Sequence, residues 1–397
     1  MNFKNINKRV LYISPDGIME PLGDSQVLKY LEKLSEKFTI TLISFEKKED
    51  FSCKNRLQNI KDRCLASNID WQYKQYRQGI FVLSYLLNVF NFISSPVLVL
   101  LKQKISIIHI RSYMPGLSIP LLSLLFNFKL LFDIRGFWAD EKHDRLGWKK
   151  NSLKYLFFKK LEHYLFRRAD AVVTLTNCSK KYISKHFNKP DEAISVIRTC
   201  VDFDEFKICV PKIKNPSLVI GYLGSIDAAY DFDLFLGFLS AIKKFNSSLE
   251  VRFLTKSSSE KIKYLLKKNN LEDLIFQNKF LSRGELSDAI SEFDLLAFCL
   301  KENFSILASM PTKIGEALAC GVPIICNSFN EDIKHIVQTE GVGQIHNFNE
   351  PFSKEAYKKL MLMVDNPQTG QKCNNFSQKE FSLTSGVSSY AKIYERL

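Results

Sequence analysis

The feature of this sequence that most constrains its fold is a repeated alternation of short apolar segments with longer amphipathic ones. The short segments have the length and composition of buried strands, and the longer ones carry apolar residues at helical spacing. In the first half of the chain, strands are expected at residues 10–14, 39–45, 105–110, 129–133, 169–175 and 193–197. This alternation predicts an α/β fold in which helices cover both faces of a parallel sheet.

A linker separates two blocks of this alternation. Residues 207–216 contain two prolines and three lysines, a composition typical of a linker. After it, strands are expected at residues 218–223, 249–255 and 294–300. A chain of 397 residues is too long for one small core and fits two domains of about 200 residues each. We therefore expect an N-terminal domain at 1–206, a C-terminal domain at 217–375 and a final segment at 376–397.

The charge of the chain favours an anionic partner. The sequence has 56 basic and 42 acidic residues, a net charge of +14, which suits a phosphorylated substrate, a nucleic acid or an anionic membrane surface. Basic motifs interleaved with aromatic residues are absent from the sequence, and so is the ligand spacing of a metal finger. We therefore expect no nucleic-acid partner.

The cysteines and the N-terminus predict a cytoplasmic protein. The nine cysteines are an odd number without a CxxC pair, which indicates separate thiols in a reducing compartment. The first nine residues are polar and lead directly into a strand, so a secretory signal is not expected.

Residues 79–101 form a run of 23 residues without a charged side chain. This run is long enough to span a bilayer, but polar residues and Pro96 interrupt it, and the next strand of the same domain must follow it. A buried helix or a peripheral membrane contact is therefore preferred to a span. Basic residues flank the run and suit anionic lipid: Lys74, Arg77, Lys102 and Lys104. We expect attachment to the inner face of the plasma membrane.

A helix followed by a strand is expected near residues 309–326. Pro311 lies near the helix start, while Gly321 and Pro323 lie beyond its end. On a helical wheel, Thr312 and Glu316 share one face, beside the small residues Gly315 and Ala319. The opposite face is apolar: Ile314, Ala317 and Leu318. The face of Glu316 is therefore expected to admit a ligand.

The chemistry of this face predicts a nucleotide-sugar site. The Glu316 carboxylate can accept hydrogen bonds from two adjacent sugar hydroxyls. The helix N-terminus, with Ser309, Thr312 and Lys313, can receive a phosphate. The alternative is an ordinary glutamate on a solvated helix face.

The stretch from Glu316 to Pro323 reads Glu-Ala-Leu-Ala-Cys-Gly-Val-Pro and resembles the donor-binding signature of glycosyltransferase family 4. The resemblance implies the GT-B fold, in which two Rossmann-like doubly wound domains face each other across a cleft. It also implies that Glu316 binds the ribose of the nucleotide sugar, and that no metal or other cofactor is required. In that fold, the helix expected at 386–397, after a polar stretch at 366–385, crosses back to the N-terminal domain.

Loops after the N-terminal strands carry the other candidate residues. Gly17 and Gly23 lie in a loop at residues 16–24, where they either approach a donor phosphate or the acceptor, or form an ordinary turn. This loop lacks a full G-x-G-x-x-G fingerprint. Arg111 follows the strand at 105–110 and is a further candidate for the same role.

The loop at residues 135–141 reads Arg-Gly-Phe-Trp-Ala-Asp-Glu and resembles a family 4 subgroup associated with bacterial surface polysaccharide synthesis. Many family members have a histidine at the position of Arg135. An arginine cannot act as a general base, so we expect Arg135 to hold an anion of the donor or the acceptor. Asp140 or Glu141 either orients acceptor hydroxyls or forms salt bridges with Lys142 or Arg145.

The sequence departs from the family pattern at three donor positions. Gly224 is followed by Ser225 instead of arginine, Tyr230 stands where a lysine is usual, and Ala308 replaces an acidic residue. Other cations must then meet the diphosphate charge. We expect these to be Lys256, Lys301 and Lys313, which lie at the ends of strands or at a helix start.

Together, these features predict a hexosyltransferase that moves a sugar from a UDP- or GDP-linked donor to a lipid-linked or oligosaccharide acceptor. The family resemblance implies retention of anomeric configuration and a role in bacterial surface polysaccharide synthesis. Two alternatives remain open at this point. A nucleotide-sugar epimerase would turn over the sugar nucleotide without an acceptor, and a non-catalytic scaffold of an assembly complex would turn over nothing.

Overall fold

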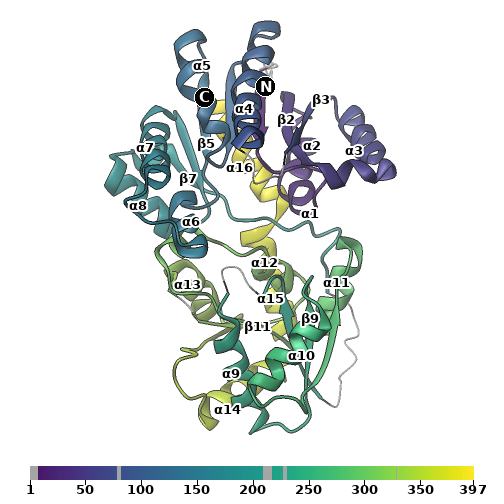
Figure 1. Cartoon of the computed structure of the whole chain (residues 1–397). Helices are drawn as coiled ribbons and strands as arrows, with labels where there is room; N and C mark the ends of the chain where they lie inside the picture. Colours follow the sequence, from purple (N-terminus) through teal and green to yellow (C-terminus); the bar gives the residue numbers. More distant parts are fainter. Residues whose placement is uncertain (1–7, 78–81, 209–216, 227–229, 328) are drawn as a thin grey trace. The chain divides into compact units, whose positions relative to one another are not determined.

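The computed structural model describes residues 8–77, 82–208, 217–226, 230–327 and 329–397 (Figure 1). The chain divides into two compact units. Unit 1 comprises Met1–Arg198 and Leu383–Leu397, and unit 2 comprises Thr199–Ser382. The division thus lies before residue 206, and most of the linker expected at 207–216 falls outside the described residues.

Unit 1 is built on a seven-stranded parallel sheet with the order β3-β2-β1-β4-β5-β6-β7. The inner strand β1 places Val10 beside Ile40 of β2 and Ile107 of β4. The strands are β1 (Arg9–Ser14), β2 (Thr39–Lys47), β3 (Ile69–Tyr76), β4 (Ile107–Arg111), β5 (Lys129–Asp133), β6 (Ala171–Thr174) and β7 (Ile194–Val196). The strand order reverses between β1 and β4, and in such sheets ligands bind at the carboxyl ends of the strands near this point.

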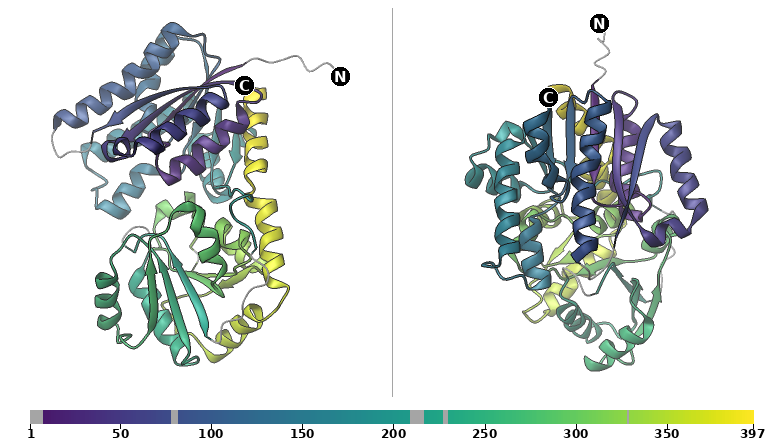
Figure 2. Two further views of the ribbon diagram at one scale, coloured as in Figure 1. Left: turned by 90° about the vertical axis from the view of Figure 1, so that its right-hand side faces the viewer. Right: turned by 45° about the horizontal axis from the view of Figure 1, so that its top comes forward.

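Right-handed crossovers divide the helices of unit 1 between the two faces of the sheet. Connections that run toward β3 place α2 and α3 on one face, and connections that run toward β7 place α4, α5, α7 and α8 on the other (Figure 2). The helices are α1 (Pro21–Gly23), α2 (Lys29–Leu34), α3 (Lys54–Ala66), α4 (Val82–Lys102), α5 (Ile119–Leu125), α6 (Trp138–Leu146), α7 (Leu153–Arg168) and α8 (Asn177–Phe187). Short π and 3-10 turns complete the unit: η1 (Asp24–Leu28), η2 (Lys48–Ser52), η3 (Pro115–Ser118) and η4 (Asp191–Ala193).

Most of the charge-free run at residues 79–101 forms the helix α4. Residues 79–81 of this run lie outside the described part. Its inner side is fixed by Phe92, which stacks on Phe45 at 3.9 Å between ring centroids. Asn88 is also buried, and its side chain exchanges two hydrogen bonds with the backbone of Arg77. Among the described residues, one helix is long and apolar enough to cross a membrane, Leu83–Lys102, and 28% of its apolar window is buried.

The C-terminal helix α16 (Leu383–Arg396) belongs to unit 1 and packs against α2. Its buried tyrosines reach the sheet. Tyr394 Oη lies 2.6 Å from His109 Nδ1, and Tyr390 Oη donates to Asp133 Oδ2 at 2.9 Å. The last helix therefore contributes to the carboxyl ends of β4 and β5.

Unit 2 is built on a six-stranded sheet with the order β10-β9-β8-β11-β12-β13, in which the paired strands are parallel. The strands are β8 (Leu218–Leu223), β9 (Leu249–Leu254), β10 (Ile275–Lys279), β11 (Leu295–Phe298), β12 (Ile324–Cys326) and β13 (Gly343–Ile345). The helices are α9 (Phe232–Lys243), α10 (Ser259–Lys268), α11 (Arg283–Ser291), the 3-10 turn η5 (Phe304–Ala308), α12 (Thr312–Ala319), α13 (Glu331–Thr339), α14 (Lys354–Val364) and α15 (Thr369–Phe381).

Most of the polar stretch at residues 366–385 forms a helix that was not predicted, α15. This helix packs against α12 and buries Cys373 and Phe381. Ser377 Oγ donates to the carbonyl of Gly315 at 2.9 Å, and Asn374 Nδ2 donates to the carbonyl of Ala319 at 2.5 Å. Two polar side chains of this stretch thus form hydrogen bonds with the neighbouring helix α12.

Candidate active site

The expected signature helix is α12 of unit 2, which begins after Pro311 and ends before Gly321, where φ is 76°. All of its residues after Thr312 are buried. The part of the expected ligand face at Gly315 is covered, because a Cβ at Gly315 would lie 2.8 Å from Val201 and 3.1 Å from Phe381. The small residue therefore allows close packing within unit 2, and Lys313 and Glu316 are left as buried charges.

Glu316 is held by an arginine from another helix. Its side chain is 7% exposed, and Oε1 accepts a hydrogen bond from Arg283 Nη1 at 3.2 Å. Arg283 also donates from Nε to Glu205 Oε2 at 3.1 Å. Burial raises the pKa of Glu316, and the Arg283 cation opposes that rise. Within the described residues no hydrogen bond to Oε2 is recorded, so this oxygen remains available to a ligand.

Lys313 is a buried cation surrounded by aromatic rings. Its Nζ lies 3.7 Å from the ring centroid of Tyr230, 5.1 Å from that of Tyr222 and 5.2 Å from that of Phe298. Across the described part of the chain, Nζ has no hydrogen-bond partner. Burial lowers the pKa of Lys313 to about 7. A buried amine without a hydrogen-bond partner is costly. This group is therefore a candidate for binding an anion.

The turn after β8 lies next to this amine. A Cβ at Gly224 would lie 3.6 Å from Lys313 Nζ, and φ of Gly224 is 104°. Ser225 lies in the same turn, and its carbonyl accepts a hydrogen bond from Tyr222 Oη at 2.9 Å. The Tyr230 ring is the closest part of the Lys313 cage, so the tyrosine at the usual lysine position lies directly beside the lysine from α12.

The other expected donor residues differ in their surroundings. Lys256 follows β9 and is exposed, with Nζ 5.1 Å from the ring centroid of Phe280. Lys301 follows the end of β11 and is also exposed. Ser309 precedes α12, and its Oγ donates to the carbonyl of Ser305 at 3.4 Å. Of the three expected cations, Lys313 is the one that is buried beside Gly224.

In unit 1, the glycine loop is fixed by a buried glutamate that the sequence analysis missed. Glu46 is fully buried at the end of β2, and its carboxylate accepts hydrogen bonds from the backbone N–H groups of Ile18 and Met19, both at 3.0 Å. A Cβ at Gly17 would lie 2.4 Å from Glu46 Oε2, and one at Gly23 would lie 1.9 Å from the Gly17 carbonyl oxygen. Both glycines are therefore needed for close packing inside the loop.

A second cluster lies at the carboxyl ends of β4 and β5. Asp133 is fully buried, with Oδ2 3.6 Å from Arg111 Nη1 and Oδ1 3.7 Å from Arg135 Nη1. Burial acts to raise the pKa of Asp133, but Arg135, His109 and Arg111 together lower it to about 2. Ser112 and Arg135 both have left-handed backbones, with φ of 61° and 55°. Non-glycine residues held in this region concentrate at functional sites.

This cluster contains polar atoms that are buried without a hydrogen bond. Among the described residues, His109 Nε2, Arg111 Nε and Asp133 Oδ1 have no hydrogen-bond partner. Arg111 Nε does lie 3.6 Å from Asp16 Oδ2, so its charge is balanced although its hydrogen bond is not formed. Such atoms indicate a position for water or for the polar groups of a ligand.

The two acidic residues expected on the loop at 135–141 lie instead in the first turn of α6. Asp140 is buried, and its carboxylate accepts hydrogen bonds from Tyr155 Oη at 2.7 Å and Lys159 Nζ at 3.0 Å. These partners come from α7 and are not the neighbouring Lys142 or Arg145. Both oxygens are therefore engaged inside the unit.

Glu141 differs from its neighbour Asp140. Its carboxylate lies beside Gly136, where a Cβ would be 2.2 Å from Oε1 and φ is 149°. Burial raises the pKa of Glu141. Within the described residues no hydrogen bond or ion pair is recorded for this side chain. Glu141 is thus the carboxylate of this pair that remains available to a ligand.

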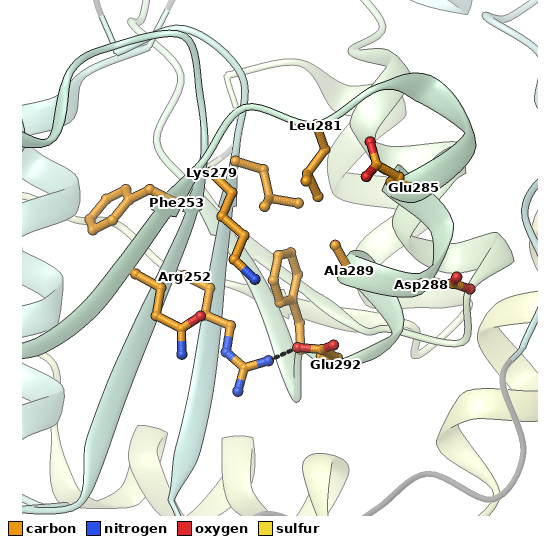
Figure 3. Close-up of a pocket in the computed structure, with 11 residues that line it drawn as sticks. Arg252, Phe253, Lys279, Leu281, Glu285, Asp288, Ala289 and Glu292 are labelled. Carbon is orange, nitrogen blue, oxygen red and sulfur yellow. Dashed lines mark hydrogen bonds and ion pairs between the residues drawn. The ribbon is translucent and has the colours of Figure 1, made fainter.

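A cavity of about 190 Å³ in unit 2 contains none of the expected site residues. It lies between α11 and the strands β9 and β10 (Figure 3). Arg252 extends from β9 and forms ion pairs with Glu250 and with Glu292 at the end of α11. The cavity is therefore separate from the groups that surround Glu316 and Lys313.

Sequence reasoning missed several residues of these clusters. Glu46 and Asp133 each stand at the carboxyl end of an apolar strand, and this position could have marked them. Arg283 and Tyr390 reach their partners only through the tertiary fold, and no local pattern indicates which residues those partners are. The pairings of Arg283 with Glu316 and of Tyr390 with Asp133 are 33 and 257 residues apart in sequence.

Two family descriptions match adjoining parts of the chain. Residues 32–205 match Glycosyltransferase Family 4, and residues 204–380 match Glycosyl transferases group 1. No curated protein matches the sequence.

Solved structures share the fold over nearly the whole chain. Sucrose-phosphate synthase from Thermosynechococcus elongatus has a TM-score of 0.70 at 12% identity, covering 98% of this chain and 99% of its own. HepE from Anabaena, in complex with UDP, has a TM-score of 0.68 at 12% identity, covering 98% and 100%. WaaG, a glycosyltransferase involved in lipopolysaccharide biosynthesis, has a TM-score of 0.63 at 12% identity, covering 97% and 99%. At this identity, the likeness establishes the two-domain architecture.

Proposed function

Because the chain belongs to glycosyltransferase family 4 and has the GT-B fold, we propose that it transfers a sugar from a nucleoside-diphosphate sugar to a lipid-linked or oligosaccharide acceptor in bacterial surface polysaccharide synthesis. The structures of HepE with UDP and with UDP-glucose support a sugar nucleotide as donor. The role of WaaG in lipopolysaccharide biosynthesis supports the class of acceptor.

The observation that carries this proposal is the pair of buried charges on α12. Glu316 offers a free carboxylate oxygen, and one turn earlier Lys313 places an unpaired amine beside Gly224 at the end of β8. A sugar nucleotide presents ribose hydroxyls and a diphosphate, which match these two groups. The carboxyl end of a parallel strand is also where such folds bind nucleotides.

Each group has a defined task in the transfer. Glu316 accepts hydrogen bonds from the ribose hydroxyls. The acceptor oxygen bonds to the anomeric carbon, the bond between that carbon and the diphosphate oxygen breaks, and the proton of the acceptor hydroxyl passes to the departing diphosphate. Lys313, together with the backbone N–H groups at the start of α12, stabilises the charge that develops on the leaving group. Gly224 lets the backbone approach the diphosphate closely. In this proposal, side-chain cations and not a metal ion neutralise the diphosphate.

The groups of unit 1 are assigned to the acceptor or to an anion. The guanidinium groups of Arg111 and Arg135 hold an anionic group of the acceptor. Glu141 accepts a hydrogen bond from the acceptor hydroxyl that attacks the sugar. Retention of anomeric configuration is expected from the family.

Nucleotide titrations test the donor site. We expect UDP or GDP to raise the thermal midpoint of the protein, because a ligand that binds the folded state stabilises it. Glu316→Gln should weaken the binding of that nucleotide by about 1 to 3 kcal/mol, measured by calorimetry, while the thermal midpoint of the free protein stays the same. Unchanged affinity would remove Glu316 from the site. Turnover of the sugar nucleotide without an acceptor would favour an epimerase, and the absence of both binding and turnover would favour a scaffold.

We also propose that unit 1 attaches peripherally to a membrane through the helices on one face of its sheet. The helices α4, α5 and α7 lie on this face, and each of them exposes large apolar side chains. The exposed residues are Leu83, Tyr85, Leu86, Phe90, Leu98, Leu101, Leu121, Leu124, Leu125, Leu153, Leu156 and Phe157. Exposed lysines accompany them: Lys102, Lys104, Lys154 and Lys160. Apolar area beside basic charge supports binding to an anionic membrane, and we propose the cytoplasmic face of the plasma membrane.

A further inference from the structure

We propose that Arg283 is a positioning residue that keeps Glu316 ionised and oriented for the donor ribose, and that Glu205 holds Arg283 in place. This inference rests on the proposed donor site. It adds two residues from outside the signature helix to that site, one from the start of α11 and one from the segment that precedes Phe206.

The guanidinium of Arg283 connects two carboxylates. Nη1 donates to Glu316 Oε1 at 3.2 Å, and Nε donates to Glu205 Oε2 at 3.1 Å. The group also lies over the ring of Phe206, with 5.0 Å between Cζ and the ring centroid. Arg283 is the first residue of α11, and the capping box of Ser282 and Glu285 fixes the helix start. The guanidinium is therefore restrained on several sides.

This arrangement determines the state of the Glu316 carboxylate. Burial favours its protonated form, whereas Arg283 and Lys313 favour the ionised form and Glu205 opposes it. With Oε1 fixed by Arg283, Oε2 is left for a ribose hydroxyl. Without the guanidinium, the buried carboxylate would have lost its ion-pair partner and would take up a proton more readily. It would then accept hydrogen bonds less well and would be free to rotate.

The structure supplies a matched control at the other end of α11. Arg252 has a side-chain exposure of 15%, close to the 19% of Arg283. It also joins two carboxylates, those of Glu250 and Glu292, and both Arg252 and Glu292 line the cavity of Figure 3. Loss of Arg252 therefore removes a similar pair of ionic contacts from unit 2 without touching Glu316.

The experiment measures UDP and GDP binding by calorimetry between pH 6 and pH 9. Arg283→Met should lower the affinity for whichever nucleotide binds by about ten- to a hundredfold at neutral pH. Part of this loss of affinity should disappear as the pH rises and Glu316 ionises. Arg283→Lys should restore part of the affinity, and Glu205→Gln should cause a smaller loss than Arg283→Met. Arg252→Met should bind as the wild type does. Wild-type affinity in Arg283→Met, or a loss that is the same at every pH, would overturn the proposal.

A second measurement tests the pair without a ligand. Arg283→Met should lower the thermal midpoint because it leaves a buried carboxylate without its partner, and adding Glu316→Gln should recover part of that loss. Additive effects of the two substitutions would overturn the proposed pairing. If neither nucleotide bound the wild type, the donor site itself would be wrong, and this double-mutant cycle would still decide whether Arg283 controls Glu316.

Discussion

The buried charges of unit 1 and unit 2 are balanced in different ways. In unit 1, Arg111 and Arg135 face the buried carboxylate of Asp133, and Arg111 also faces Asp16. In unit 2, Lys313 lies among aromatic rings without a hydrogen-bond partner in the described residues. The first cluster is already neutralised inside the protein. The second holds a group that gains a partner only when an anion binds, and this difference suggests that the diphosphate belongs to unit 2.

The largest effect on stability is expected in the balanced cluster. Asp133→Asn leaves two guanidinium groups facing a neutral side chain, and breaking a buried ionic cluster in this way costs about 3 to 5 kcal/mol. Chemical denaturation should measure this loss at neutral pH. A loss below about 1 kcal/mol would be that of a surface pair and would contradict the interpretation of the cluster as internally neutralised.

The pH dependence of the same variant provides a control. The pKa of Asp133 is lowered from 3.8 to about 2 in the folded protein. The ionised carboxylate therefore stabilises the fold fully above the unfolded pKa, and this stabilisation is lost as the pH falls through the folded pKa. Between pH 4 and pH 2, the difference in stability between the wild type and Asp133→Asn should therefore become smaller. A constant difference across this range would assign the loss to packing.

Replacing the unbalanced cation should have the opposite effect on stability. The pKa of Lys313 is lowered from 10.5 to about 7 by burial, so its protonation destabilises the fold increasingly as the pH falls from 10.5 toward 7. Lys313→Met removes this cost and should raise the thermal midpoint. Turnover should fall by roughly ten- to a thousandfold, because one stabiliser of the leaving group is lost.

Proton uptake sharpens this prediction. Nucleotide binding should recharge Lys313, so calorimetry of the wild type in buffers of different ionisation enthalpy should reveal a proton taken up near pH 7, and Lys313→Met should not take it up. Lys256→Ala and Lys301→Ala should change turnover less, because both lysines are exposed. Near-normal turnover in Lys313→Met would move the role to one of these lysines, and normal turnover in all three variants would remove the idea of substitute cations.

The neighbouring residues Asp140 and Glu141 extend the comparison within unit 1. Asp140 is paired with Tyr155 and Lys159, whereas no ion pair is recorded for Glu141 within the described residues. Asp140→Asn should therefore lower stability, and Glu141→Gln should instead lower kcat/KM for the acceptor by about ten- to a hundredfold. Thermal melts and steady-state kinetics of both variants would distinguish these roles. Equal effects of the two on turnover would contradict the separation.

The sequence was sufficient for the features that depend on local patterns. The alternation of apolar and amphipathic segments predicted two parallel sheets, and the proline and glycine signals placed α12 correctly. The capping box of Ser282 and Glu285 at the start of α11 is likewise formed by residues three positions apart. These features depend on residues close together in the chain, where spacing alone carries the information.

The surroundings of the candidate site could not be predicted in the same way. The helical wheel placed Gly315 near Glu316, but it could not show that Val201 and Phe381 would cover Gly315. The Lys313 cage likewise combines rings from residues 222, 230 and 298. Burial and long-range pairing decide whether a charge is available, and both are properties of the tertiary fold.

The smallest expected effect concerns the outer face of unit 1. Along α4, the exposed residues Leu83, Leu86, Phe90, Leu98 and Leu101 recur at helical spacing. Leu86→Glu should reduce flotation with anionic liposomes by about tenfold, because it replaces apolar area by a negative charge next to an anionic surface.

Unit 2 provides the matched control for this substitution. Leu362 on α14 is 75% exposed, against 55% for Leu86, so its exposure is no smaller. If membrane affinity belongs to the α4 face, Leu362→Glu should float with the liposomes as the wild type does. Salt should release the wild type from anionic liposomes, since screening weakens the contribution of the flanking lysines. Retention through high salt and an alkaline wash would indicate a true membrane span, and equal behaviour of the two glutamate variants would show that the exposed leucines of α4 do not contact lipid.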